Sequence, residues 1–281
     1  MRVQTGILCY NGRFQAASGP IFTADNRGFR YGDGCFETLK VYQGRVLLDD
    51  LHFERLMASV HLLHLEMPKY FTREYLSDLI IQLCIRNKAE KLARVRLSVF
   101  RTEGGLYAPE NNHAEFMIQC WELSRQVFEL NDNGLSIDIY PDSRKTCEKL
   151  SNIKSSNCLP YILASMYAKQ HDLNDALLLN TRGRVADATS SNVFIVRGKE
   201  VWTPPLSEGC VCGVMRKHLL NLDTTLQLRE HPISVADLEN ADEIFLTNAI
   251  YGIRWVERFR DNSYGNATAS ILHDLLHEAV L

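Results

Sequence analysis

The chain has 281 residues, of which 46% are hydrophobic and 23% charged, and its formal net charge at pH 7 is −3. These values are ordinary for a globular protein with one large domain or two smaller ones, and they allow a sizeable core. The small negative charge gives no reason to expect nucleic-acid or membrane binding.

No run of 18 apolar residues is present, so we expect no transmembrane helix, and the N-terminal residues lack the apolar region of a signal peptide. The eight cysteines are scattered without a repeated spacing. They fit a reduced cytoplasmic protein better than a disulfide framework. Cys210 and Cys212 could form half of a metal site, but no second pair or histidine cluster accompanies them, so no metal is expected.

The first part of the chain predicts short strands and two helices. Residues 1–17 predict a hairpin, because Asn11 and Gly12 separate apolar runs. A glycine-rich stretch follows and continues as a β-rich run. Apolar spacing predicts helices over 51–63 and 72–87, and strict alternation predicts a strand over 93–100. A further strand is expected over 114–121.

The second part of the chain begins after a change in composition. Residues 122–133 become rich in Asn, Asp and Gly, which indicates an interdomain connection. We therefore expect a smaller domain over 1–121 and a larger one over 134–281. The larger domain is predicted to contain strands over 135–140, 175–180 and 243–248 and a final helix over 270–278.

Lys154 is a candidate nucleophile. It lies among small polar residues, before apolar residues with helical spacing at Leu159, Ile162, Leu163 and Met166. A lysine in a loop that enters a helix can be desolvated and become nucleophilic, as Schiff-base chemistry requires. The alternative is an ordinary solvated lysine.

Two other places suit an anion such as phosphate. Arg55 follows His52 by three positions on a predicted helix, and it is either an exposed arginine or one that points inward to hold an anion. Gly213 precedes a predicted helix, whose first N–H groups can bind an anion. With Lys154, these features suit a phosphorylated aldehyde cofactor.

Six motifs then resemble those of the fold-type IV pyridoxal-phosphate enzymes, which include branched-chain aminotransferase, D-amino-acid aminotransferase and aminodeoxychorismate lyase. They occur in the order found in that family: residues 31–36, His52 with Arg55, 154–157, Asp187 with Asn192, 213–216, and 247–250. The resemblance implies a two-domain α+β fold similar to D-amino-acid aminotransferase. It also implies pyridoxal 5′-phosphate (PLP) as cofactor and a homodimer.

The resemblance also implies a role for individual residues. Lys154 would be the Schiff-base lysine that moves protons, and Asp187 would pair with the cofactor's ring nitrogen. The family normally has glutamate there, so the shorter aspartate requires either a closer backbone or a bridging water. The cofactor-binding residues implied are Arg55, Lys154, Asp187, Asn192, and the N–H groups of Val214 and Met215 at the phosphate.

Details of the motifs favour the lyase within this family. Residues 32–36 and 213–216 look closer to the lyase forms. Thr38 stands where lyases resemble one another in carrying a threonine, and its hydroxyl could assist proton delivery by Lys154. The alternative is a β-branched residue that suits a strand. Substrate contacts are expected from Phe36, Arg101, Tyr107, Ala249 and Ile250, although Arg101 and Tyr107 are about as well explained as a strand end and a lid contact.

The implied lyase reaction removes pyruvate from 4-amino-4-deoxychorismate and leaves 4-aminobenzoate for folate synthesis. One alternative is amino-group transfer between a branched-chain or D-amino acid and a 2-oxo acid. A second is a protein that holds the cofactor with little activity, for which the change at Asp187 is the only sequence reason.

Overall fold

A computed structural model describes residues 6–280, so residues 1–5 of the predicted hairpin lie outside the described part. The chain divides into two compact units. Unit 1 contains the described residues up to Arg125 together with Ile153–Asn157, and unit 2 contains Gln126–Asn152 and the chain from Cys158 onward. The first division lies inside the expected connection 122–133. The segment Ile153–Asn157 departs from expectation, because the sequence places everything after residue 133 in one domain.

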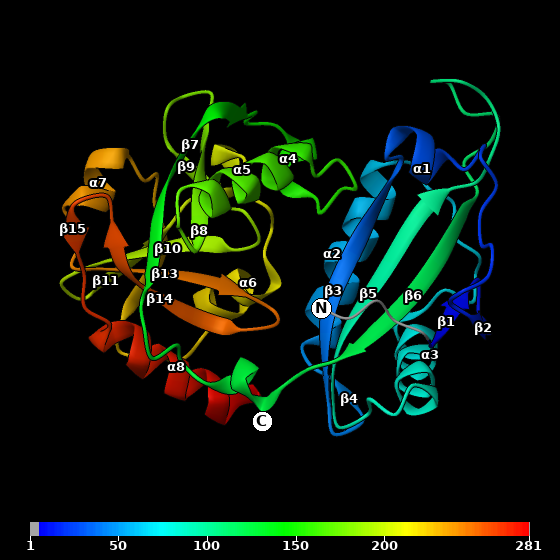
Figure 1. The fold of residues 1–281 in the computed structure, drawn as a ribbon, viewed down its shortest axis with the longest axis horizontal. Helices are drawn as coiled ribbons and strands as arrows, with labels where there is room; N and C mark the ends of the chain where they lie inside the picture. The colour runs from blue at the N-terminus through cyan, green and yellow to red at the C-terminus, as the bar shows by residue number, and fades with distance from the viewer. Residues whose placement is uncertain (1–5, 281) are drawn as a thin grey trace. The chain divides into compact units, whose positions relative to one another are not determined.

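Unit 1 is built on an antiparallel six-stranded sheet, coloured from blue to green in Figure 1. Its strand order is β2-β1-β6-β5-β3-β4. The strands are β1 Ile7–Tyr10, β2 Arg13–Ala16, β3 Gly34–Tyr42, β4 Arg45–Val46, β5 Leu92–Arg101 and β6 Ala114–Glu122. Three helices complete the unit: α1 Arg27–Tyr31, α2 Asp49–Leu62 and α3 Arg73–Arg86.

Alternation along β3 and β5 gives the sheet two different faces. Leu39 and Val41 on β3 pack with Leu56 and Val60 of α2, and apolar residues of α3 join the same core. Helices α2 and α3 lie along this face in Figure 1. Because successive side chains of a strand point to opposite faces, the even-numbered residues of β3 point away from the helices.

Unit 2 is built on a nine-stranded mixed sheet of order β12-β11-β10-β13-β14-β7-β8-β9, with β15 paired to β14. The strands are β7 Leu135–Lys145, β8 Asp175–Asn180, β9 Val185–Ala188, β10 Asn192–Arg197, β11 Glu200–Thr203, β12 Gln227–Glu230, β13 Glu243–Asn248, β14 Gly252–Phe259 and β15 Asn262–Ser263. Every residue of β8 and β9 is buried. That burial explains the nearly continuous apolar run over 175–180.

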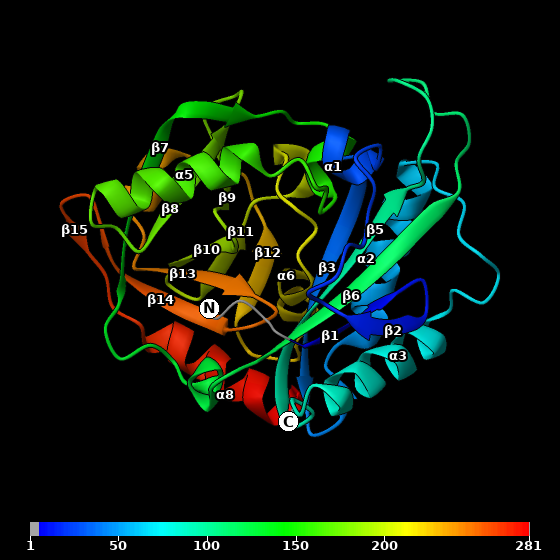
Figure 2. The same cartoon turned by 45° about the vertical axis from the view of Figure 1, so that its right-hand side comes forward.

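Helices and short helical turns cover this sheet. They are η1 Arg125–Phe128, α4 Lys149–Asn152, α5 Leu159–Gln170, η2 Leu206–Glu208, α6 Val214–Leu220, α7 Val235–Glu239 and α8 Ala267–Val280. Helix α5 packs along β7 and β8, and α8 packs along β13 and β14 (Figure 2). Helix α5 buries Ala164 and Ala168 against Tyr140 and Leu178, which allows a close approach to the strands.

The two mixed units confirm the expected α+β fold class. Within residues 6–280, no helix combines the length and the apolar character needed to cross a bilayer. The eight cysteines, all of which lie in the described part, form no disulfide.

Candidate active site

Lys154 belongs to unit 1 because its segment pairs with the start of β3. The amide of Phe36 donates to the carbonyl of Lys154, and the amide of Ser156 donates to that of Gly34, each at 2.9 Å. The Lys154 Nζ lies 4.6 Å from the centroid of the Phe36 ring. The backbone of the candidate nucleophile is therefore fixed, and its amine lies over an aromatic ring.

Phe36 is part of a basic sheet face, which we define as Phe36, Thr38 and Lys40 of β3 with Arg94, Arg96 and Ser98 of β5. The register places Phe36 opposite Ser98 and Thr38 opposite Arg96. The Arg96 guanidinium lies 3.6 Å from the Phe36 centroid, and its Nε donates to the Ser98 hydroxyl at 3.1 Å. Phe36 thus contacts two cations, Lys154 and Arg96.

Arg96 is a residue for which the sequence assigned no role. Its signal was the strict alternation over 93–100, which puts Arg94 and Arg96 on one face of the strand. Lys40 on the same face is buried, and burial lowers its pKa to about 8. Such a face of the sheet suits an anionic ligand.

Arg55 of α2 faces the other side of β3, where it meets Glu37. Its Nε and Nη2 donate to the two carboxylate oxygens of Glu37 at 2.7 and 2.5 Å, and His52 Nδ1 lies 2.7 Å from the same carboxylate. Burial alone raises the pKa of Glu37, but the Arg55 charge and the hydrogen bonds from Arg55 and His52 outweigh it and bring the pKa to about 2. The carboxylate fixes two of the three guanidinium nitrogens of Arg55.

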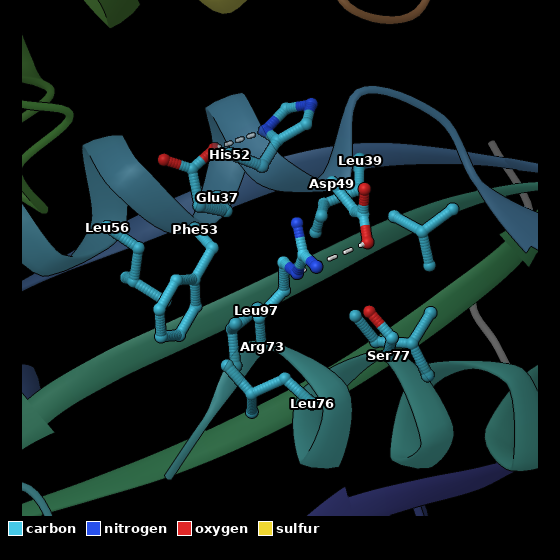
Figure 3. Close-up of a pocket in the computed structure, with 12 residues that line it drawn as sticks. Glu37, Leu39, Asp49, His52, Phe53, Leu56, Arg73, Leu76, Ser77 and Leu97 are labelled. Atoms are coloured by element: carbon cyan, nitrogen blue, oxygen red, sulfur yellow. Dashed lines mark hydrogen bonds and ion pairs between the residues drawn. The ribbon is translucent and has the colours of Figure 1, made fainter.

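Glu37 and His52 also line a pocket between the sheet and its two helices, shown in Figure 3. The other lining side chains are mainly apolar, apart from Asp49, Arg73 and Ser77. Arg73 and Asp49 approach to 3.9 Å there. The charged groups of the pocket therefore occur in pairs, Glu37 with His52 and Arg55, and Asp49 with Arg73.

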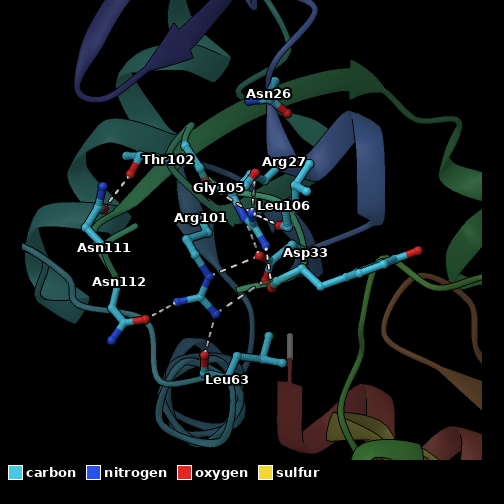
Figure 4. A network of polar contacts seen from close by, with 12 residues as sticks. Asn26, Arg27, Asp33, Leu63, Arg101, Thr102, Gly105, Leu106, Asn111 and Asn112 are labelled. Atoms are coloured by element: carbon cyan, nitrogen blue, oxygen red, sulfur yellow. Dashed lines mark hydrogen bonds and ion pairs between the residues drawn. The ribbon is translucent and has the colours of Figure 1, made fainter. Parts of the chain in front are cut away.

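Arg101 does not lie on the basic sheet face, and its guanidinium is committed elsewhere (Figure 4). It donates to both carboxylate oxygens of Asp33, to Asn112 Oδ1, and to the carbonyls of Leu63 and His64. The side chain is 8% exposed. These bonds involve all three nitrogens and join β5 to neighbouring loops. The expected substrate contact of Arg101 stays a prediction.

Tyr107 lies in an exposed loop of unit 1. It is 90% exposed, and its ring centroid is 5.7 Å from that of Tyr31. The buried Arg27 holds this loop by donating to the carbonyls of residues 104–107 (Figure 4). Within unit 1, Tyr107 therefore has the geometry of a loop tip.

Asp187 of β9 lies in unit 2 among hydrogen-bond donors. Lys145 Nζ and the Tyr161 hydroxyl donate to its Oδ2 at 2.5 and 3.0 Å. Asn192 Nδ2 donates to Oδ1 at 3.2 Å, and the Val211 amide approaches both oxygens. The predicted pair of Asp187 and Asn192 is therefore in direct contact, and Lys145 and Tyr161 are two partners that the sequence did not indicate.

Gly213 stands directly before α6, where Val214 and Met215 are the first two helical residues. A Cβ atom at Gly213 would come within 1.7 Å of Asn192 Oδ1, so only glycine permits this approach. As the N-cap residue, Gly213 also has no side chain with which to cap the helix. The start of α6 therefore packs directly against Asn192 and has no side-chain cap of its own.

Ala249 and Ile250 form a turn between β13 and β14. Asn248 Oδ1 accepts from the amides of Ile250 and Tyr251 at 3.0 and 2.9 Å, and Asn248 Nδ2 donates to the Ser191 hydroxyl. The Asn248 side chain therefore fixes the two predicted substrate-binding positions.

A comparison with protein-family models shows which family the chain belongs to. Residues 34–259 match the family model described as amino-transferase class IV. The chain belongs to the class IV aminotransferase family. The expected family and its enzymatic character are thereby confirmed, and the cofactor is confirmed as well, because enzymes of this family depend on PLP.

Individual members of the class IV family differ in reaction. The chain is 29% identical to an aminodeoxychorismate lyase of Bacillus subtilis over 92% of this chain and 89% of that one. It is 26% identical to a D-alanine aminotransferase of Bacillus licheniformis over 86% and 84%. A branched-chain aminotransferase from Thermoproteus uzoniensis has the same fold, with a TM-score of 0.87, 23% identity and coverage of 98% and 94%. The chain is therefore a class IV enzyme whose reaction these relatives leave open.

The residues of the chain fit PLP in three respects. Lys154 supplies a primary amine over an aromatic ring. Arg55 supplies a guanidinium in a fixed orientation, and Gly213 leads into the first amides of α6 without a side chain that caps them. The acid at Asp187 is present too, although it already has a lysine partner.

Proposed function

We propose that this class IV enzyme is a PLP-dependent lyase that converts 4-amino-4-deoxychorismate to 4-aminobenzoate and pyruvate. The observation that carries the proposal is the basic sheet face beside Lys154. Thr38 shares one face of β3 with Phe36, whose ring contacts both Lys154 and Arg96. The substrate has two carboxylates, which suit a face that presents several cations.

Bound PLP supplies an electron sink for the carbon that loses its proton. Lys154 would hold the cofactor until the amine of the substrate displaces it, and the freed Lys154 amine would then take this proton. Thr38 offers a hydroxyl on the same face through which Lys154 returns a proton as pyruvate leaves. Arg96 orients a carboxylate of the substrate, with Phe36 below it. Ala249 and Ile250 contribute a turn of fixed shape to substrate binding.

The remaining cofactor contacts follow the family resemblance. Arg55 would bind the phosphate, with its guanidinium held in orientation by the Glu37 carboxylate. The first amides of α6, at Val214 and Met215, donate to the phosphate as well. Asp187 would pair with the ring nitrogen of the cofactor, and Asn192 would hold Asp187 in place. Each role is tested by the PLP dissociation constant of the corresponding variant.

A homodimer is part of the proposal. The apolar residues Leu159, Ile162, Leu163 and Met166 of α5 have helical spacing, yet each is 47–69% exposed in the single chain. A row of four exposed apolar side chains on one helix suits a subunit contact. Sedimentation equilibrium of the wild type and of Ile162→Glu tests this, and a monomeric wild type would contradict it.

The competing function is an aminotransferase that uses branched-chain or D-amino acids with a 2-oxo acid, and similarity to the D-alanine aminotransferase favours it. The decisive experiment supplies purified enzyme and PLP with aminodeoxychorismate and no 2-oxo acid. The lyase forms 4-aminobenzoate and pyruvate in equal amounts. Formation of neither product, with transfer from D-alanine or L-valine to 2-oxoglutarate, would refute it.

Two variants connect the reaction to the proposed residues. Lys154→Ala should abolish product and also the adduct that borohydride fixes between PLP and the chain. Thr38→Val should lower kcat by about a hundredfold, the low end of the usual contribution of proton transfer, whereas Thr38→Ser keeps a hydroxyl and should keep most of the rate. Equal rates for Thr38→Val and the wild type would remove Thr38 from the mechanism.

A further inference from the structure

Unit 2 contains a buried ion pair, one partner of which has no role in the proposed reaction. The two partners are Lys145, at the end of β7, and Asp187, in the middle of β9. Their charged atoms are 2.5 Å apart, and their side chains are 8% and 3% exposed. An ion pair so deeply buried is stable only with both partners present, since either charge alone would remain uncompensated.

Tyr161 of α5 completes the cluster. Lys145 Nζ donates to the Tyr161 oxygen at 2.5 Å, and the Tyr161 hydroxyl donates to Asp187 Oδ2 at 3.0 Å. Burial, followed by the Asp187 charge, raises the pKa of Tyr161 well above its ordinary value, so the hydroxyl stays protonated and remains a donor. We call Lys145, Tyr161 and Asp187 the acid cluster.

The two oxygens of Asp187 differ in their surroundings. Oδ2 accepts from Lys145, Tyr161 and the Val211 amide, at distances from 2.5 to 3.1 Å. Oδ1 accepts only longer bonds, from Asn192 at 3.2 Å and the Val211 amide at 3.3 Å. The acid cluster therefore fixes one edge of the carboxylate and leaves Oδ1 as the more weakly bonded oxygen.

We propose that Lys145 is a positioning residue that neutralises Asp187, so that the bound cofactor's ring nitrogen meets an acid cluster of zero net charge. The proposal rests on the role of Asp187 in the proposed function. A carboxylate favours protonation of a nearby base through its charge, and a cation beside it cancels most of that effect. The ring nitrogen is thus protonated less readily than beside an unpaired carboxylate, and Asn192 and Lys145 keep Asp187 oriented.

Other ionisable groups near the acid cluster do not restore the charge. Cys210 packs close to Asp187, and burial followed by the Asp187 charge raises the pKa of its thiol to about 12, so it remains neutral. Cys158 is close to Tyr161. Arg216 is close to Cys210, and it donates to the Pro204 carbonyl and pairs with Glu230. Lys145 is the cation that contacts the carboxylate.

The test measures the pH midpoint at which the ring nitrogen of bound PLP loses its proton, followed by nitrogen NMR of enzyme loaded with PLP isotopically labelled at that atom. Lys145→Met leaves a net negative acid cluster and should move the midpoint upward by about 1–3 pH units, the usual effect of one neighbouring charge. Asp187→Asn leaves a net positive cluster and should move it downward. Lys145→Met with Asp187→Asn together restores zero net charge, so its midpoint should lie within about half a pH unit of the wild type.

Further variants separate charge from structure. Lys145→Arg retains the cation and should keep the wild-type midpoint, and Lys169→Met, at an exposed lysine of α5, is the matched control. If Lys145→Met does not fold, the double variant and Asp187→Asn still test the sign of the charge effect. Identical midpoints for the wild type and Asp187→Asn, or a double variant displaced as far as Lys145→Met, would overturn the proposal.

Failure of the proposed function gives a different result. If borohydride fixes no PLP at Lys154 of the wild type, the cofactor role itself is wrong. If PLP is fixed there and the midpoints do not follow the charge of the acid cluster, only the role of Lys145 is wrong.

Discussion

Glu37→Gln should reduce the stability of the fold in a pH-dependent way. Glu37 is buried against Arg55 and His52, and its folded-state pKa of about 2 lies below the ordinary value of 4.5. This difference corresponds to about 3 kcal/mol, since each pKa unit corresponds to about 1.4 kcal/mol. Because the folded pKa is the lower one, this stabilisation is complete above about pH 4.5 and is lost as the pH falls toward 2.

Urea unfolding of the PLP-loaded protein at pH 6 and pH 3 measures the effect. Over that range the wild type should lose about 2 kcal/mol that Glu37→Gln does not lose, because glutamine has no proton to gain. Glu122→Gln, at an exposed end of β6, is the control and should follow the wild type. A Glu37→Gln variant whose stability falls with pH as steeply as that of the wild type would refute the assignment of this charge to the Arg55 pair.

Two other substitutions test the site. Gly213→Ala would force a Cβ atom against Asn192 and should weaken PLP binding at least tenfold in a fluorescence titration. Gly265→Ala, where a Cβ atom meets nothing within 4 Å, is the control and should bind PLP normally. Equal PLP affinities of the two variants would contradict a role of the α6 start in cofactor binding. Arg101→Met leaves Asp33 and three other acceptors short of a donor, so it should cost about 3 kcal/mol in urea unfolding without raising the substrate KM of the folded fraction. A large rise in KM at unchanged stability would instead support the expected contact between Arg101 and the substrate.

The sequence predicted most regular elements because their apolar spacing is local. The predicted helix 72–87 corresponds to α3, and the predicted strands 93–100 and 175–180 correspond to β5 and β8. Helix α1 escaped prediction because five residues give too little periodicity. In α5 the apolar spacing was read correctly, but Leu159 and Ile162 face outward and small alanines form the packed face.

The candidate site was less predictable, because its contacts join residues that are distant in sequence. The motif containing Asp187 is visible as a pattern, but its ion pair with Lys145 spans 42 positions and needs the paired strands β7 and β8 to bring the regions together. Arg101 and Arg96 belong to the same strand. Only the register shows that Arg96 shares a face with Phe36 while Arg101 turns to Asp33.

The five residues Ile153–Asn157 interrupt unit 2 in sequence yet belong to unit 1 in space. A chain cut after Arg125 would consequently leave the lysine on one fragment and its β3 partner on the other. Expressing either fragment alone would therefore remove the backbone hydrogen bonds between the Lys154 segment and β3. A recombinant of this family should therefore retain a strand equivalent to the one beginning at Gly34 to pair with the lysine pentapeptide.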